Sequence, residues 1–162
     1  MWARLRDRRR RSTARKAALT VALVGNPNAG KTAIFNRLTG LAHKVGNYPG
    51  VTVERKEGYG VARGVHLRFI DLPGTYSLAA HSPEERVAVD VLLGTQRGEK
   101  RPDLVLQIVD ASNLERNLYL LSQVLETGLP VVVALNMMDV AGSRGLRIDA
   151  RRLSERGASP AS

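Results

Sequence analysis

The sequence contains no cysteine, only three histidines, and no apolar run of the roughly 18 residues that a membrane-spanning helix needs. Without cysteine the chain forms neither disulfides nor thiolate metal sites, which agrees with a reducing, cytoplasmic setting. The histidines are scattered and form no pair at the spacing of zinc ligands. A length of 162 residues fits one domain with one core. These features predict a cytoplasmic globular domain without a membrane-spanning segment.

Basic residues are concentrated at the start of the chain. Residues 1–16 hold eight of the 25 lysines and arginines and one acid, so they carry +7 of the net charge of +10. A block of like charge is usually disordered, and no apolar stretch follows it, as one would in a secretory signal. Such an arm can touch RNA or anionic lipid headgroups. We expect a solvated extension over residues 1–16 and no dedicated binding of nucleic acid.

The segment Gly25–Thr32 reads Gly-Asn-Pro-Asn-Ala-Gly-Lys-Thr, which is a complete phosphate-loop motif. It lies between an apolar run at 19–24, predicted to be a buried strand, and a helix predicted at 32–38. Glycines let backbone N–H groups close around phosphate oxygens, and the helix N-terminus adds partial positive charge. Lys31 is expected to reach the β- and γ-phosphates, and the Thr32 hydroxyl to ligate Mg²⁺. The residues expected to hold the phosphates are Gly25, Asn26, Asn28, Ala29, Gly30, Lys31, Thr32 and Ala33.

Two further segments are predicted to act on the same phosphates. Asp71 follows a predicted strand at 65–70, where its carboxylate is expected to hold the Mg²⁺ shell, and the Gly74 N–H can meet the γ-phosphate. Thr52 lies in a polar, turn-rich segment at 41–53, which is predicted to be irregular. Its hydroxyl can complete Mg²⁺ coordination only while γ-phosphate is present, which predicts an order–disorder switch.

A guanine site is predicted at Asn136-Met-Met-Asp139. This segment follows the apolar run 131–135, which predicts a fully buried strand. The Asp139 carboxylate can accept from the N1–H and the exocyclic amine of guanine, whereas adenine lacks that donor pair. Many GTPases carry lysine after the asparagine, and Met137 can pack on the base in its place.

Strand and helix patterns alternate along the chain. Two capping boxes, at Ser82–Glu85 and Ser112–Glu115, predict helix starts. The second helix is expected to bury one leucine face, formed by Leu114, Leu118, Leu121 and Leu125. Further strands are predicted at 53–62, 65–70 and 104–109, with Arg63-Gly64 as a hairpin turn, and a weak helix at 149–156. This order predicts an α/β fold with a mostly parallel sheet and one antiparallel strand. Ligands of such sheets bind at the carboxyl ends of the strands, where the phosphate loop, Asp71 and Asn136–Asp139 are predicted to lie.

Together these motifs resemble the N-terminal GTPase domain of the ferrous-iron transport protein B (FeoB) family, over about residues 19–156. The resemblance rests on the segments 25–32, 47–54, 71–78, 80–85 and 136–139. It implies a Ras-like phosphate-loop GTPase that binds GTP, GDP and Mg²⁺, hydrolyses GTP slowly, and serves bacterial Fe²⁺ uptake at the cytosolic face of the inner membrane. Asn28 resembles an asparagine that lets some of these enzymes use K⁺ as an activating ion.

Catalytic roles follow from the same resemblance. Ras has a water-orienting glutamine after the glycine, whereas this chain has Thr75. The reaction is therefore assigned to Lys31, Thr52 and Gly74, with Glu84 and Glu85 as an alternative pair that positions water.

The resemblance ends near Arg156. The family's GTPase domain continues with a strand, a Ser-Ala loop that contacts guanine and a last helix, followed by a spacer and a membrane permease region. Residues 157–162 match none of these, so we expect a GTPase domain at 17–156 that is C-terminally incomplete, impaired in activity and unable to conduct iron alone. Two alternatives remain, a non-catalytic nucleotide-binding fragment and a ribosome-associated GTPase that uses the basic arm on RNA. Leu72 and Met137 depart from the spellings typical of the latter class.

Overall fold

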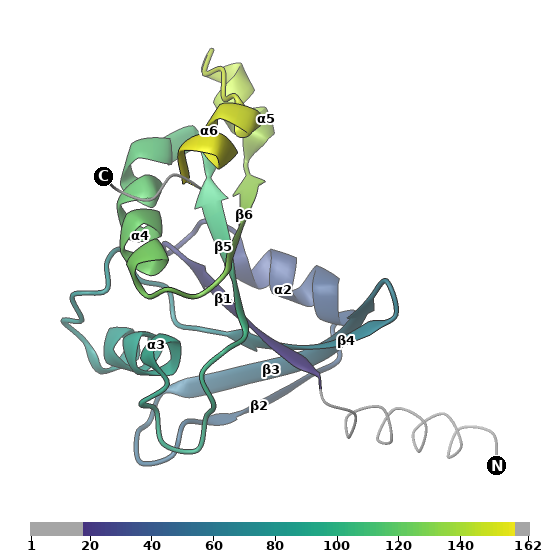
Figure 1. Cartoon of the computed structure of the whole chain (residues 1–162), viewed down its shortest axis with the longest axis vertical. Helices are drawn as coiled ribbons and strands as arrows, with labels where there is room; N and C mark the ends of the chain where they lie inside the picture. The colour runs from purple at the N-terminus through teal and green to yellow at the C-terminus, as the bar shows by residue number, and fades with distance from the viewer. Residues whose placement is uncertain (1–17, 158–162) are drawn as a thin grey trace.

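The computed structural model describes residues 18–157, in which six strands form one sheet in the order β2-β3-β4-β1-β5-β6 (Figure 1). The strands are β1 (Leu19–Gly25), β2 (His43–Asn47), β3 (Glu54–Ala62), β4 (Val65–Asp71), β5 (Leu104–Asp110) and β6 (Val131–Asn136). β3 pairs antiparallel with both β2 and β4, and the remaining pairs are parallel. Only β3 therefore runs against the other strands, which confirms the predicted sheet. The predicted arm at 1–16 and residues 158–162 of the predicted tail lie outside the described residues.

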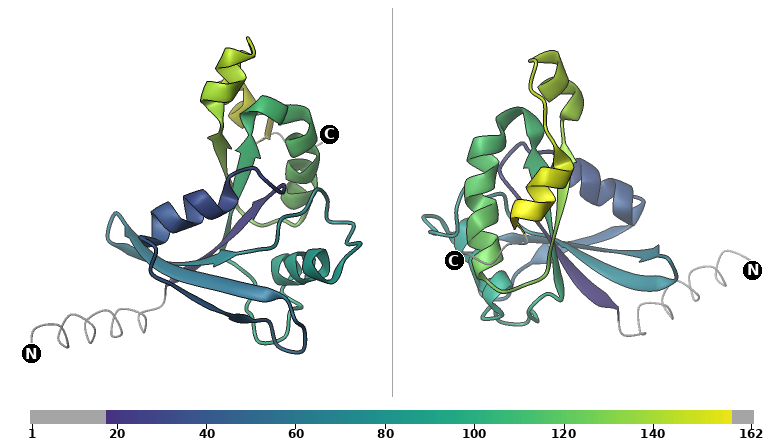
Figure 2. Two further views of the ribbon diagram at one scale, coloured as in Figure 1. Left: turned by 180° about the vertical axis from the view of Figure 1, so that it is seen from behind. Right: turned by 45° about the horizontal axis from the view of Figure 1, so that its top comes forward.

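Helices cover both faces of the sheet (Figures 1 and 2). They are α2 (Lys31–Thr39), α3 (Pro83–Leu93), α4 (Leu114–Glu126), α5 (Met138–Ser143) and α6 (Ala150–Gly157), and a 3₁₀ turn η1 (Ala111–Asn113) precedes α4. α2 lies on one face, and α3 and α4 lie on the other. No helix within residues 18–157 is long and apolar enough to cross a membrane.

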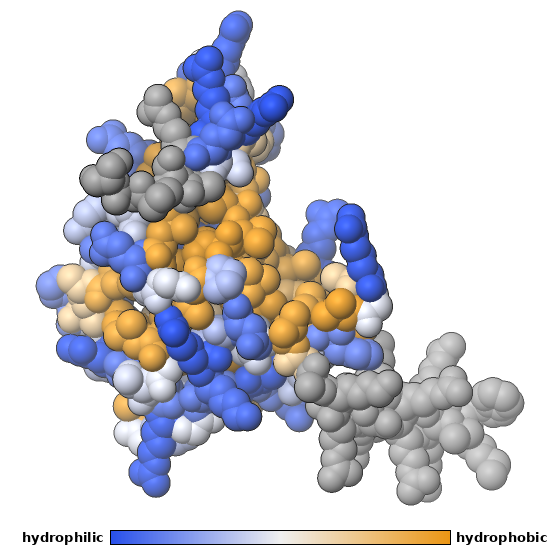
Figure 3. Space-filling model, viewed as in Figure 1, coloured by the Kyte–Doolittle hydropathy of each residue, from blue (hydrophilic) through white to orange (hydrophobic). Residues whose placement is uncertain are grey.

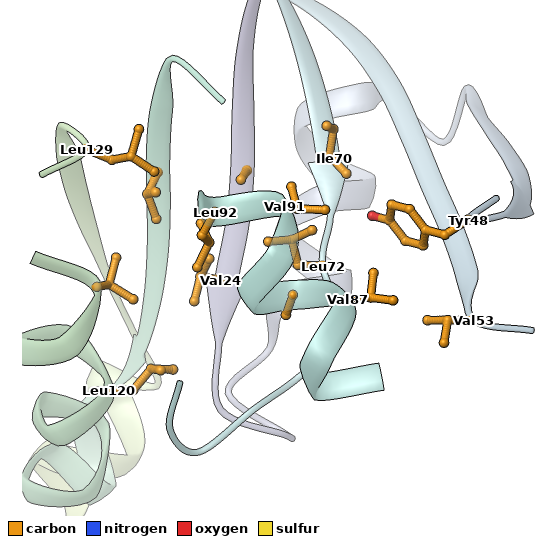
Figure 4. Packing of buried hydrophobic residues seen from close by; sticks show 14 residues of the cluster. Val24, Tyr48, Val53, Ile70, Leu72, Val87, Val91, Leu92, Leu120 and Leu129 are labelled. Carbon is orange, nitrogen blue, oxygen red and sulfur yellow. The ribbon is translucent and has the colours of Figure 1, made fainter. Parts of the chain in front are cut away.

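The central strand β1 is buried on both faces, which explains the apolar run at 21–24. Val21 and Leu23 pack in the cluster that contains Phe35 of α2, whereas Ala22 and Val24 belong to the cluster beneath α3 and α4. Figure 4 shows the second cluster, in which side chains of α3 meet those of the sheet. The strand that leads into the phosphate loop is thus fixed from both sides.

Two predicted local signals form as expected. Arg63 and Gly64 both have positive φ, at 48° and 80°, and they join β3 to β4 as a tight hairpin turn. The Ser82 hydroxyl accepts from the Glu85 N–H at 3.1 Å and caps α3. The Glu85 carboxylate, however, accepts from the His81 N–H at 2.8 Å, one residue before the partner that a capping box requires.

The prediction of an irregular segment at 41–53 is wrong in part, because His43–Asn47 forms the strand β2. Four of its five residues are exposed, so the strand shows no alternation of buried and exposed side chains that the sequence could reveal. β2 is an edge strand that pairs only with β3, from His43 opposite Gly58 to Asn47 opposite Glu54. The segment at 48–53 therefore becomes the loop of a β2–β3 hairpin.

The prediction that 131–135 is a fully buried strand is also wrong. β6 lies at the edge of the sheet, none of its residues is fully buried, and Val132 is 50% exposed. An apolar groove of about 440 Å³ runs between α4, β6 and α6, and Figure 3 shows the hydrophobic surface in this region. An apolar run marks a strand but does not say whether a neighbour covers it.

The start and the buried face of α4 also differ from the prediction. The Ser112 side chain does not cap α4; instead the Asp110 carboxylate accepts from the Ser112 N–H at 2.8 Å and from its hydroxyl at 2.7 Å. The buried face consists of Asn117, Leu120, Leu121 and Val124, and Leu125 is exposed. Asn117 is buried because its amide accepts from the Asp110 N–H and donates to the Asn113 carbonyl. A satisfied asparagine therefore occupies a position that a pattern of leucines does not reveal.

Candidate nucleotide site

The predicted site segments converge at one edge of the sheet. The phosphate loop begins where β1 ends, and Asp71 at the end of β4 lies opposite Leu23 of β1. On the other side of β1, Gly25 lies opposite Ile108 of β5, and the last pair of β5 with β6 joins Asp110 to Asn136. The register thus places the three segments beside one another at the carboxyl ends of parallel strands.

A cavity of about 600 Å³ opens at this edge. It is lined by Asn26, Pro27, Asn28, Gly30, Lys31, Thr32, Ala33, Pro73, Gly74 and Glu84. The loop after β1, the start of α2 and the segment after β4 therefore enclose one space. Of the two acids proposed to position water, only Glu84 lines it.

The Lys31 ammonium forms an ion pair with the Asp71 carboxylate. Their side chains are 11% and 6% exposed, so the two opposite charges are largely withdrawn from water. Sequence reasoning assigned both residues to a nucleotide but did not predict that they pair. The contact places a cation suited to phosphate oxygens next to an anion suited to a divalent metal.

The asparagine of the predicted base site is bound to the phosphate loop. The Asn136 amide donates to the Ala29 carbonyl at 2.9 Å. Gly30 has a φ of +89°, and a Cβ there would lie 2.1 Å from the Asn136 Nδ2 atom. Only glycine fits this contact without displacement, so Asn136 positions the loop, a role that the sequence did not indicate.

The segment after β4 also contacts the phosphate loop, through Gly74 and Thr75. A Cβ on Gly74 would lie 3.3 Å from the Pro27 backbone, and the Thr75 N–H donates to the Gly25 carbonyl at 3.2 Å. The buried Thr75 hydroxyl donates to the Ser77 carbonyl at 2.6 Å and lies 3.3 Å from Glu85 Oε1. Thr75 therefore stabilises the segment at the position where Ras carries its glutamine.

Glu85 is occupied by structural contacts. The hydrogen bond from the His81 N–H, together with the nearby Thr75 hydroxyl and Ser82 backbone, lowers the pKa of the Glu85 carboxyl below its ordinary value. A carboxylate held in its ionised form by these donors is a poor general base. Of the two acids predicted to position water, only Glu84 lines the cavity.

The remaining predicted residues differ in whether they line the cavity. Thr52 is exposed on the hairpin loop and is not among the residues that line the cavity. Met137 has a φ of 57° and is the N-cap of α5, and Asp139 is exposed in the first turn of that helix. Asn28, with a φ of 65°, lines the cavity. The structure therefore brings most of the predicted phosphate-loop residues and Gly74 to one cavity, whereas Thr52, Asn136, Met137 and Asp139 are not among the residues that line it.

Sequence reasoning missed the surroundings of Asn26. This residue is 4% exposed, and neither polar atom of its amide has a hydrogen-bond partner among the described residues. It also lines a second cavity of about 190 Å³ behind the loop, together with Asp110, Asn113 and Arg116. The Arg116 guanidinium lies 3.9 Å from the centroid of the Tyr76 ring, which ties α4 to the segment after Gly74.

The residues at the cavity fit a magnesium ion that shares its ligands with phosphate. Residues 18–157 contain no group of three or more His, Cys, Asp or Glu side chains that could hold a metal by themselves. The Asp71 carboxylate and the Thr32 hydroxyl supply oxygen, the donor that Mg²⁺ prefers, and Mg²⁺ is commonly held by one or two carboxylates together with phosphates.

Comparison with known proteins gives consistent matches. A family model described as Ferrous iron transport protein B matches residues 19–160. The Fe(2+) transporter FeoB of Salmonella typhimurium is 50% identical over 142 residues, which is 85% of this chain and 18% of that protein. The Fe(2+) transporter FeoB of Shigella flexneri is 49% identical over the same shares. The chain thus spans about a fifth of the length of these relatives.

Solved structures are equally similar. A crystal structure of an S. thermophilus NFeoB mutant bound to mGDP has a TM-score of 0.78 and 50% identity, covering 86% of this chain and 51% of that one. The G domain of the T. maritima FeoB iron transporter has a TM-score of 0.76 and 44% identity, covering 86% of this chain and 82% of that one. The predicted fold and the predicted resemblance are both confirmed.

Proposed function

This chain belongs to the ferrous iron transport protein B family, and we propose that it binds GTP and GDP with Mg²⁺ and hydrolyses GTP slowly. One observation carries the proposal. The phosphate loop, Lys31 and Gly74 line a single cavity of about 600 Å³ at the carboxyl edge of the sheet, and Asp71 forms an ion pair with Lys31. Relatives solved with mGDP or GDP support a guanine nucleotide as the ligand.

The phosphates would be held by the loop and by the start of α2. Backbone N–H groups from Gly25 to Thr32 point their partial positive charge at phosphate oxygens. Lys31 leaves Asp71 and contacts the β- and γ-phosphates. Asp71 and Thr32 would hold Mg²⁺, which offsets negative charge between the β- and γ-phosphates when it is bound.

Hydrolysis is assigned to groups that stabilise charge on the γ-phosphate. Gly74 lies against Pro27 of the phosphate loop, and its N–H would donate to a γ-phosphate oxygen. Thr52 would supply its hydroxyl as a further oxygen ligand for Mg²⁺ in the triphosphate state. With Thr75 engaged by Ser77, the attacking water is oriented by backbone groups and by Glu84. A site without a strong general base agrees with slow turnover.

Guanine would be selected by Asp139, which accepts from N1–H and the exocyclic amine. Adenine would leave that carboxylate unpaired and desolvated, which costs about 1–3 kcal/mol. Met137 packs on the base, and Asn136 links this side of the site to the phosphate loop through Ala29. Through this hydrogen bond, binding of the base would be coupled to the position of the phosphate loop.

Asn28 is proposed as a ligand of an activating K⁺ ion. It lines the phosphate cavity, and a monovalent cation beside the bridging oxygen would stabilise the same charge as an arginine finger. The expected result is faster phosphate release in K⁺ than in Na⁺ at equal ionic strength. Asn28→Ala should remove that difference and leave GDP affinity unchanged.

Iron uptake is proposed from the names of the relatives, which are Fe(2+) transporters about five times as long as the matched segment. In that setting the domain would lie at the cytosolic face of the bacterial inner membrane and act on a membrane permease region. Its hydrolysis cycle would then regulate permeation, and iron itself would not touch the nucleotide site.

Nucleotide titration with a fluorescent GDP tests the proposal. Wild-type protein with Mg²⁺ is expected to bind GDP and GTP, with ATP competing about five- to 150-fold more weakly, as expected from about 1–3 kcal/mol of discrimination. Lys31→Ala should abolish binding and phosphate release, whereas Lys44→Ala, an exposed lysine on β2, should change neither. Equal affinity for ATP, or full binding by Lys31→Ala, would contradict the proposal. Binding without phosphate release in K⁺ would leave a nucleotide-binding module that is not an enzyme.

A further inference from the structure

Thr52 lies at the tip of a closed hairpin. Asn47 and Glu54 form the last pair of β2 and β3, and the Tyr48 N–H continues the ladder by donating to the Val53 carbonyl at 3.0 Å. The Val51 N–H donates to the Tyr48 carbonyl at 3.3 Å, which closes a turn over Pro49 and Gly50. Gly50 has a φ of +81°, as the third residue of a type II turn requires. The turn chemistry of the sequence therefore favours this closed form.

Both ends of the tip are held in the core. Tyr48 is 1% exposed and Val53 is 4% exposed, and both belong to the apolar cluster beneath α3. Figure 4 shows the Tyr48 ring beside Val53 and Val87. The Tyr48 hydroxyl has no hydrogen-bond partner among the described residues, and burial raises the pKa of that hydroxyl. The ring, and not the hydroxyl, is what fixes Tyr48 in the core.

The outer side of the tip rests on the loop between α3 and β5. A Cβ on Gly98 would lie 3.0 Å from the Pro49 Cγ atom, so the two residues are in close contact. The next residue, Glu99, has a side chain that is 3% exposed and accepts from Arg55 at 3.0 Å and from Arg68 at 2.7 Å. These two arginines, from β3 and β4, hold the loop in the place where Pro49 meets it.

The tip holds Thr52 at a position that does not line the phosphate cavity. Thr52 is exposed, and only four residues separate the two buried positions 48 and 53. Because both ends of the tip are held, a movement of Thr52 toward the phosphate cavity would open the Tyr48–Val53 hydrogen bond or draw the Tyr48 ring out of its packing.

We propose that Tyr48 is a positioning residue that holds Thr52 away from the phosphate cavity and opposes binding of the triphosphate. The inference rests on the proposed function, because it assigns Thr52 to the Mg²⁺ shell in the triphosphate state. Two arrangements of one hairpin then compete. The docked arrangement has the ring in the core, and the engaged arrangement has Thr52 at the nucleotide. A ligand that binds the engaged arrangement better loses part of its binding free energy to undocking Tyr48. Weaker docking of Tyr48 therefore raises the affinity for that ligand and not for the other.

The test compares two nucleotides on four forms of the full chain. Dissociation constants of a fluorescent, non-hydrolysable GTP analogue and of fluorescent GDP are measured with Mg²⁺ for wild type, Tyr48→Phe, Tyr48→Leu and Tyr48→Ala. Tyr48→Ala is expected to tighten the GTP analogue about fivefold or more, a typical coupling between two sites, with GDP affinity unchanged. Tyr48→Leu should give a smaller gain. Tyr48→Phe should match wild type, because the hydroxyl has no partner to lose. In a Thr52→Ala background the gain should vanish.

Three outcomes overturn the inference. The first is an equal change for both nucleotides, which marks Tyr48 as a core residue only. The second is a gain that persists without Thr52, and the third is a Tyr48→Phe variant that behaves like Tyr48→Ala. If thermal melts show that Tyr48→Ala does not fold, Tyr48→Leu decides, and an unchanged ratio of the two constants then counts against the inference. Failure of wild-type protein to bind either nucleotide contradicts the proposed function instead.

Discussion

The Lys31 ammonium, which lines the phosphate cavity, forms an ion pair with the carboxylate of Asp71, 40 residues further along the sequence. Each residue belongs to a different part of the proposed nucleotide site, one to phosphate and one to Mg²⁺. Binding of a magnesium nucleotide would therefore replace the ion pair between Lys31 and Asp71 by two contacts with the ligand, of Lys31 with phosphate and of Asp71 with Mg²⁺. This exchange keeps the charges neutralised in both states and avoids an isolated buried charge.

Asp71→Asn is predicted to destabilise the protein even without nucleotide. The substitution leaves the largely buried Lys31 ammonium without its counter-charge, which costs about 1–3 kcal/mol. It also removes the carboxylate proposed for Mg²⁺, so added GDP and Mg²⁺ should stabilise the variant less than wild type. Urea unfolding with and without GDP and Mg²⁺ measures both effects.

Glu126→Gln, at an exposed position at the end of α4, is the matched control and should change neither quantity. An Asp71→Asn variant as stable as wild type would show that the pair contributes nothing to the fold. Undiminished stabilisation by GDP and Mg²⁺ would remove Asp71 from the metal site.

Gly30→Ala is predicted to disrupt the phosphate loop through one contact. A Cβ at this position would lie 2.1 Å from the Asn136 Nδ2 atom, so the amide must move and its bond to Ala29 must break. Gly40→Ala is a close control, because Gly40 also has a positive φ, at 62°, but its Cβ would meet nothing within 4 Å. Backbone strain of about 1–2 kcal/mol is common to both variants.

The excess loss of stability in Gly30→Ala over Gly40→Ala should be about 1 kcal/mol or more, the cost of a lost hydrogen bond with a buried partner. Nucleotide binding should be lost in Gly30→Ala and retained in Gly40→Ala. Equal losses of stability in the two variants, measured by urea unfolding, would mean that Asn136 yields to the new methyl group without cost.

The acid stability of the protein is predicted to depend on Glu99. Burial opposes its charged form, but Arg68 and Arg55 outweigh burial and hold the pKa of the Glu99 carboxyl below its ordinary value of 4.5. A group with a lowered folded-state pKa contributes stability above its unfolded pKa and loses it as the pH falls through the folded pKa. The contribution of Glu99 should therefore be intact above pH 5 and decline below about pH 4.5.

Thermal melts from pH 7 to pH 3 of wild type and Glu99→Gln test this dependence. The variant should be less stable than wild type at pH 7, and the two melting temperatures should converge as the pH falls. If the two melting temperatures differ by the same amount at every pH, Glu99 does not account for the loss of stability in acid.

The parts of this structure that the sequence predicted are those with short-range causes. The phosphate loop, the Arg63-Gly64 turn and the Ser82 cap each follow from residues within a few positions of one another. The bond from Asn136 to Ala29 joins residues 107 positions apart, and no local pattern contains it. The same holds for the exposure of β6, because an apolar run such as Val131–Leu135 does not say which strand or helix lies beside it. Long-range packing therefore decided what local patterning left open.

The two capping boxes of the sequence illustrate this limit and allow a direct test. Ser82 caps α3 through the Glu85 N–H, so Ser82→Ala should cost about 1 kcal/mol of stability. Ser112 looks equivalent in the sequence, but Asp110 accepts from both its N–H and its hydroxyl and caps the 3₁₀ turn η1. Ser112→Ala should therefore cost about half as much or less, because only one neutral partner of Asp110 is lost. Asp110→Ala should cost more than Ser112→Ala, since it leaves the Ser112 N–H without its acceptor. Urea unfolding of the three variants decides the order, and a Ser112→Ala loss equal to that of Ser82→Ala would show that the second box forms after all.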